Sequence, residues 1–243
     1  MASHPLKGAF DRVNRAQQHL ADFEGRQDTF GQFYHDSLVI EFDANNDHKP
    51  VIRPGKPIYI ETAFGILVGE IVYNLRAALD YLIYELAILD TKLVQDGTQF
   101  PICDTKSAFD GVEKKFLVGL NTTHRAGIER LQPYSGCDWT PILRDISNPD
   151  KHRHLTLPAH TYAIRMTTIP SNRGWLKDFG LAPIVRSVRR TMYPSLGREV
   201  DVYLSSEAPI IIDVGGRPEP VVKLMKYVKA RVTETLEAFK PEF

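Results

Sequence analysis

Residues 69–86 read GEIVYNLRAALDYLIYEL, and this stretch decides the fold. Apolar residues recur at steps of three and four from Val68 to Leu86, a spacing typical of an amphipathic helix. The apolar stripe is wider than a helix lying on the surface of a protein needs. The sequence therefore predicts a central core helix over about residues 62–89.

Helix-forming and strand-forming patterns are separated along the chain. Helical spacing recurs within residues 1–150, whereas most of the stretches from about 155 to 214 are short, apolar and separated by Gly, Pro, Asn and Ser. Helical spacing returns over residues 219–239. This separation favours an α+β fold. We predict a single domain over residues 1–243, with a helical part at 1–150 and a strand-rich part at 151–243. In this domain we expect the central helix to pack on a mainly antiparallel sheet, and a C-terminal helix to close the core.

Composition and charge exclude several classes of protein. Of the 243 residues, 43% are hydrophobic and 25% are charged, which is ordinary for a soluble globular protein. Thirty basic side chains balance thirty acidic ones, and this argues against bulk electrostatic binding of nucleic acid. No signal-peptide pattern or long apolar run is present, so we predict a cytoplasmic protein with no membrane span.

The two cysteines, Cys103 and Cys137, form no CxxC pair. The sequence therefore predicts neither a zinc ribbon nor a disulfide framework, and free thiols are expected in a reducing compartment. Walker A and GxGxxG motifs are absent from the sequence, so we predict no cofactor.

The densest polar stretch is NPDKHRHL, residues 148–155. Residues 141–146 before it predict a short helix, which we expect to end near Asn148 because Pro149 follows. If the stretch after Pro149 is helical instead, Asp150 is an N-cap and the polar residues are structural.

An extended conformation would give the same stretch chemical functions. Asp150, His152 and His154 would then lie on one face. Two imidazoles and a carboxylate can bind a metal ion, but three ligands so close together on one strand are crowded, and we predict no metal. Either histidine could instead be a general acid or base, because histidine titrates near neutral pH.

The central helix supplies polar partners for this stretch. Arg76 and Asp80 are spaced i, i+4, so they can pair with each other or reach polar groups elsewhere. A guanidinium is well suited to hold a carboxylate or a phosphate. We predict one polar cluster between the central helix and the NPDKHR segment, with these members: Asn74, Arg76, Asp80, Asp150, His152 and Arg153.

Four short motifs follow one another in the chain: NLRAALDYLIYEL, QFPI, ERLQPY and ISNPDKHR. This order resembles a group of uncharacterised bacterial and phage proteins, over roughly residues 60–155. The resemblance implies a bacterial or phage source and no particular activity.

The central helix also resembles the RxxxxH motif of HEPN nucleases, which are helical RNases that cleave without a metal ion. The resemblance puts Arg76 in the role of the arginine, but Tyr81 occupies the position of the histidine. A tyrosine, with a reference pKa near 10, is a poor base at neutral pH. A histidine of the DKHR segment would have to replace it.

Two functions follow from these residues. The first, which we favour, is a non-catalytic binding or interaction protein whose Arg/Asp/His cluster is structural or holds an anion. The alternative is a metal-independent phosphodiesterase or RNase, with His152 or His154 as acid or base and Arg76 or Arg153 on the phosphate. The partners that the sequence allows are a small anion, RNA or a second copy of the chain in a homodimer.

Overall fold

The computed structural model describes residues 4–43, 46–55, 59–152, 162–169, 187–193, 198–207 and 209–243. The chain forms two compact units, and both combine segments that are far apart in the sequence. The helical unit comprises residues 1–23, 61–157 and 212–243, and the strand-rich unit comprises residues 24–60 and 158–211.

Helix α2 (Thr62–Thr91) is the core of the helical unit. Fourteen of its residues are buried, and they recur with helical spacing from Phe64 to Ala87. The helix ends where Lys92 adopts a left-handed conformation and donates its backbone N–H to the carbonyl of Ile88. The predicted central helix over residues 62–89 is thus confirmed.

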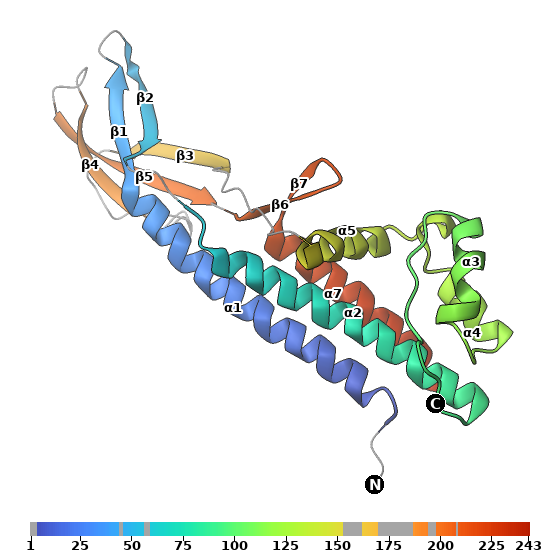
Figure 1. Ribbon diagram of the computed structural model, residues 1–243. Coiled ribbons are helices and arrows are strands. Elements are labelled where there is room, and N and C mark those ends of the chain that lie inside the picture. The colour runs from blue at the N-terminus through green and yellow to red at the C-terminus, as the bar shows by residue number, and fades with distance from the viewer. Residues whose placement is uncertain are drawn as a thin grey trace. The chain divides into compact units, whose positions relative to one another are not determined.

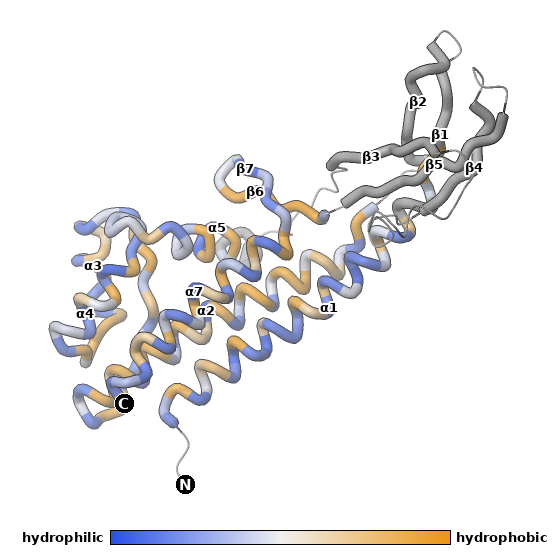
Figure 2. The backbone as a smooth tube through the Cα atoms, turned by 180° about the vertical axis from the view of Figure 1, so that it is seen from behind, coloured by the Kyte–Doolittle hydropathy of each residue, from blue (hydrophilic) through white to orange (hydrophobic). Residues whose placement is uncertain are grey.

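The other helices of this unit surround α2. The first part of α1 (Lys7–Ser37) and α7 (Val221–Phe239) run alongside α2 (Figure 1). The remaining helical elements are α3 (Lys106–Phe116), α4 (Thr122–Glu129), η1 (Pro133–Ser135), α5 (Trp139–His152) and η3 (Lys240–Glu242). Apolar segments along α2 and α7 form the centre of the unit (Figure 2).

Among the described residues, α2 is also the one helix long and apolar enough to cross a membrane. However, 56% of its most apolar window is buried inside the protein. The core helix of a soluble protein has the same length and composition, so this is weak evidence for a membrane span.

In its described residues, the strand-rich unit contains two antiparallel sheets. Strand β1 (Leu38–Asp43) pairs with β2 (Asn46–Pro54). The other sheet has the order β3-β5-β4, with β3 at Tyr162–Ile169, β4 at Ser187–Tyr193 and β5 at Arg198–Glu207. Strands β6 (Ile211–Val214) and β7 (Arg217–Pro220) form another two-stranded sheet, which belongs almost entirely to the helical unit. The antiparallel strands and the C-terminal helix confirm the predicted α+β class.

Helix α5 differs from the prediction. It does not end near Asn148 but continues through Pro149 to His152. A proline inside a helix removes one backbone hydrogen bond and disfavours the helical conformation of the preceding residue, but it does not forbid a helix. Leu143 and Ile146 are buried on the preceding turns, and their packing holds the helix despite the local cost of Pro149. Asp150 therefore lies inside the helix and is not its N-cap.

Candidate functional site

Arg76 and Asp80 both bind the backbone of Phe100. They lie one turn apart on α2, and both reach the extended segment that precedes α3. Arg76 Nη2 donates a hydrogen bond to the carbonyl oxygen of Phe100 at 3.0 Å, and Asp80 Oδ1 accepts the N–H of Phe100 at 2.9 Å. The two side chains therefore satisfy both polar groups of one buried residue, which would otherwise be costly to bury.

Gln132, which follows α4, binds the same segment. Its side chain is fully buried, and its Oε1 accepts the N–H of Cys103 at 2.9 Å. Its Nε2 donates to the carbonyl oxygens of Pro101 at 3.0 Å and Ile128 at 3.1 Å. Residues 100–103, here called the FPIC segment, are thus fixed between α2 and the end of α4. The motifs around NLRAALD, FPI and LQPY are parts of this one hydrogen-bonded arrangement.

A pocket of about 300 Å³ is lined by Arg76 and Asp80, and it is here called the Arg76 pocket. It is formed by α1, α2, α5 and the residue before Phe100. Its lining residues are Arg12, Val72, Tyr73, Arg76, Ala77, Asp80, Tyr81, Gln99 and Ser147. Tyr73 and Tyr81 are exposed, so the pocket has an aromatic rim at the surface.

The guanidinium of Arg76 has unused binding capacity. Its Nη1 atom is buried and has no hydrogen-bond partner among the described residues. Burial lowers the pKa of Arg76, and the nearby charge of Asp80 acts in the opposite direction. An arginine nevertheless stays charged at any physiological pH. A buried donor that carries charge and lacks a partner is energetically costly, and an anion would remove that cost.

Arg12 brings a second guanidinium to the pocket from α1. Its Nη1 donates to Asn74 Oδ1 at 3.3 Å, and its Nη2 donates to Tyr81 Oη at 3.2 Å. The guanidinium carbon lies 5.9 Å from the centre of the Tyr73 ring and 5.4 Å from that of Tyr81. The hydrogen bond to Tyr81 raises the pKa of Arg12, with burial opposing it. These contacts hold the side chain of Arg12 at the mouth of the pocket.

The structure brings together part of the predicted cluster. Arg76 and Asp80 line the pocket, and Asn74 is linked to it through Arg12. Ser147 of α5 also lines the pocket, so the helix that carries the first part of the NPDKHR segment approaches it. Asp150 and His152 are backbone positions of α5, and Arg153 lies outside the described residues, as does the candidate acid or base His154.

Two residues of this site were missed by the sequence analysis. Arg12 is one of several charged residues on α1, and only the packing of α1 on α2 distinguishes it. Gln132 could have been found, because a polar residue inside the LQPY motif, next to an apolar run, is a candidate for a buried hydrogen-bonding role.

The described residues contain no group of three or more His, Cys, Asp or Glu side chains that could hold a metal ion. Cys103 and Cys137 are free thiols, and both are half-buried. Burial raises the pKa of Cys103, with Asp104 adding to the effect and Arg144 opposing it.

No protein-family model, curated protein or solved structure matches this chain. The function is therefore argued from the site alone.

Proposed function

We propose that the protein is a non-catalytic binding protein that holds a small phosphate-bearing anion in the Arg76 pocket. The observation that carries the proposal is the buried Nη1 atom of Arg76, which has no partner among the described residues and belongs to a pocket-lining side chain. Arg12 supplies a second cation at the mouth of the same pocket.

The charges and the volume suit a small ligand. Among the described residues, two guanidinium groups and one carboxylate line the pocket, so this part of the lining carries a net positive charge. A volume of about 300 Å³ is at the lower end of the range for small-molecule sites. It suits a phosphate group with a small organic part rather than a large cofactor. The exposed rings of Tyr73 and Tyr81 offer flat apolar surfaces on which a base or another planar group can stack.

Binding is favoured over catalysis because Arg76 and Asp80 already have structural partners. Both hold the backbone of Phe100, and neither faces a described histidine that could accept a proton. The free thiols of Cys103 and Cys137 are in keeping with the cytoplasmic location that we include in the proposal.

A metal-independent RNase is the competing function. One observation favours it: Ser147 lines the pocket, and its helix continues to His152. In that case the anion in the pocket would be the phosphodiester of an RNA chain, with His152 or His154 as acid or base.

Isothermal titration calorimetry with inorganic phosphate and with adenosine monophosphate tests the proposal. The variant Arg12→Gln is expected to weaken binding at least about tenfold, the usual effect of losing a charged hydrogen bond. The matched control is Arg15→Gln, because Arg15 is exposed on the same helix and bonds only to Gln18 among the described residues. Equal affinities of both variants and the wild type, or no binding at all, would refute the proposal.

The same proteins should be incubated with a single-stranded RNA to separate binding from cleavage. The proposal predicts intact RNA. Cleavage that is lost in His152→Ala, with unchanged thermal unfolding, would instead establish the RNase.

A further inference from the structure

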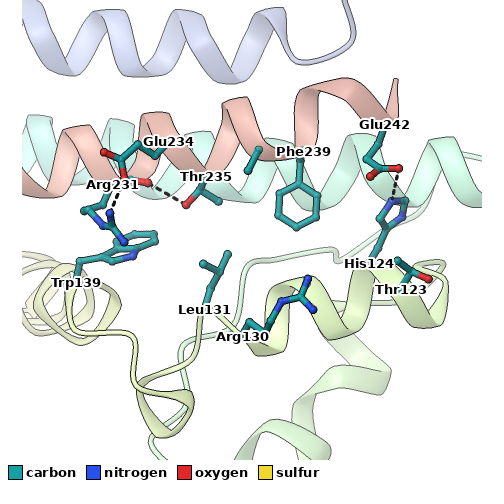
Figure 3. A pocket seen from close by; sticks show the side chains of 12 residues that line it. Thr123, His124, Arg130, Leu131, Trp139, Arg231, Glu234, Thr235, Phe239 and Glu242 are labelled. Atoms are coloured by element: carbon teal, nitrogen blue, oxygen red, sulfur yellow. Dashed lines mark hydrogen bonds and ion pairs between the residues drawn. The ribbon is translucent and has the colours of Figure 1, made fainter.

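The helical unit has a second pocket, which is separate from the Arg76 pocket and is here called the His124 pocket. Its volume is about 350 Å³. Figure 3 shows its side chains, which come from α4, α5, α7 and η3. Its lining residues are Thr123, His124, Gly127, Arg130, Leu131, Trp139, Arg231, Glu234, Thr235, Ala238, Phe239 and Glu242.

The orientation of His124 is fixed by Asp90. The Nδ1 atom of His124 lies 2.7 Å from Asp90 Oδ2, and both side chains are almost fully buried. Asp90 also accepts hydrogen bonds from the backbone N–H and the side-chain amide of Asn121, the N-cap residue of α4. Since an ionised carboxylate only accepts, Nδ1 of His124 carries the hydrogen that it donates to Asp90.

The hydrogen bonds among Asp90, Asn121 and His124 have a structural role, but this role explains only the contact to the Nδ1 atom of the imidazole. Asp90 and Asn121 cap α4, and this explains the contact to Nδ1. The Nε2 atom lies on the wall of the pocket, 3.9 Å from Glu242 Oε2 (Figure 3), and in a neutral imidazole that donates through Nδ1 it is an acceptor. Two acceptors at this separation can both receive a hydrogen bond from one ammonium group placed between them.

Arg130 supplies a positive charge to the same pocket. Its guanidinium folds back along α4, and Nη2 lies 3.9 Å from the position that a Cβ atom on Gly127 would occupy. Arg130 has no side-chain hydrogen bond or ion pair with another described residue, whereas Arg231 is paired with Glu234. Arg130 is therefore the cation of this pocket that is available for a carboxylate.

Apolar groups form the remaining wall. The ring of Phe239 packs edge-on against His124, and the buried Trp139 also lines the pocket. Gly127 lets Phe239 approach α4 closely, because a Cβ atom there would lie only 2.9 Å from the ring. Leu131 completes this wall.

From this arrangement we infer that the His124 pocket binds a small zwitterion, namely an α-amino acid with an apolar side chain. The ammonium group lies between His124 and Glu242, the carboxylate pairs with Arg130, and the side chain contacts Phe239 and Leu131. The inference is independent of the function proposed for the Arg76 pocket, because the two pockets share no lining residue.

Calorimetry on the full chain with three probes tests this inference. The probes are L-leucine, N-acetyl-L-leucine, which lacks the ammonium group, and L-leucinamide, which lacks the carboxylate. L-leucine is expected to bind, and each blocked probe is expected to bind at least about tenfold more weakly.

Two variants on the rim of the pocket assign the charges. Glu242→Gln should weaken L-leucine but not N-acetyl-L-leucine, and Arg130→Gln should weaken L-leucine but not L-leucinamide. Both side chains are exposed, so neither change is expected to unfold the protein. Glu237→Gln is the control, since Glu237 is exposed near the end of α7 and is not part of the pocket.

A second readout does not depend on variants. The Nε2 resonance of His124, labelled with ¹⁵N, should shift when L-leucine is added and stay in place with N-acetyl-L-leucine. No heat and no shift at millimolar L-leucine would overturn the inference. The inference would also be overturned if both variants lost the same affinity for all three probes, because this would show a nonspecific effect of charge.

Discussion

Arg76 and Asp80 bind opposite sides of one residue: Arg76 donates to the carbonyl of Phe100 at 3.0 Å, and Asp80 accepts its N–H at 2.9 Å. The spacing of i, i+4 on α2 therefore serves to hold a third segment. Gln132 completes this arrangement from the side of α4. Arg76 and Asp80 are thus part of the framework, and the Nη1 atom of Arg76, which has no partner among the described residues, is the group that we propose for a ligand.

Asp80→Asn should lower the free energy of unfolding by about 1–3 kcal/mol. The change removes a charged acceptor for the N–H of Phe100 and the negative charge that offsets the buried guanidinium of Arg76. Urea denaturation measures the loss. Asp96→Asn, at an exposed position in the loop after α2, is the control. If both variants unfold at the same urea concentration, Asp80 has no role in the framework.

Gln132→Leu should lower the free energy of unfolding by more than about 2 kcal/mol, because it leaves the N–H of Cys103 and the carbonyl of Pro101 buried without their partner. Hydrogen exchange provides a local readout: the amide of Cys103 should lose protection before those of α2. Gln18→Leu, on the exposed face of α1, serves as the comparison. Unchanged protection at Cys103 would contradict the role given to Gln132.

Two glycine substitutions inside helices should differ in effect. Gly111 of α3 has no atom within 4 Å of a Cβ position, so Gly111→Ala should stabilise the protein by about 1 kcal/mol. At Gly127 of α4 the added carbon would lie 2.9 Å from the ring of Phe239. We expect Gly127→Ala to be at least about 1 kcal/mol less stable than Gly111→Ala. Equal melting temperatures would show that Phe239 does not pack as described.

The carboxyl group of Glu85 gives a prediction for how the stability of the protein depends on pH. Burial raises the pKa of its carboxyl group, so the folded protein favours the protonated form more than the unfolded chain does. The penalty for the charged form is therefore present at neutral pH and disappears as the pH falls below the unfolded pKa of about 4.3. Glu85→Gln should raise the melting temperature at neutral pH and leave it unchanged below about pH 4. A gain of the same size at both pH values would contradict this assignment.

The sequence predicts the elements that depend on local patterns. Helix α2 was predicted correctly because burial on one wide face imposes helical spacing. The end of α5 was predicted wrongly, because the local effect of Pro149 is weaker than the packing of Leu143 and Ile146.

The sites were harder to predict, since they depend on contacts between distant segments. Arg76 and Asp80 were expected to be important, and QFPI was noted as a motif, but the sequence does not show that both side chains bind the backbone of Phe100. Arg12 is separated from Asn74 by 62 positions, and Asp90 from His124 by 34. No periodicity connects such pairs.

The measurement that tests the central claim most directly is an NMR titration of the arginine side chains with inorganic phosphate. The Arg76 guanidinium signals are assigned by their disappearance in Arg76→Lys. The account predicts that phosphate shifts the signals of Arg76 and Arg12 together, with one affinity, and leaves Arg15 unchanged. Signals of Arg76 that do not respond, while exposed arginines shift weakly and without saturation, would show that the pocket does not hold an anion.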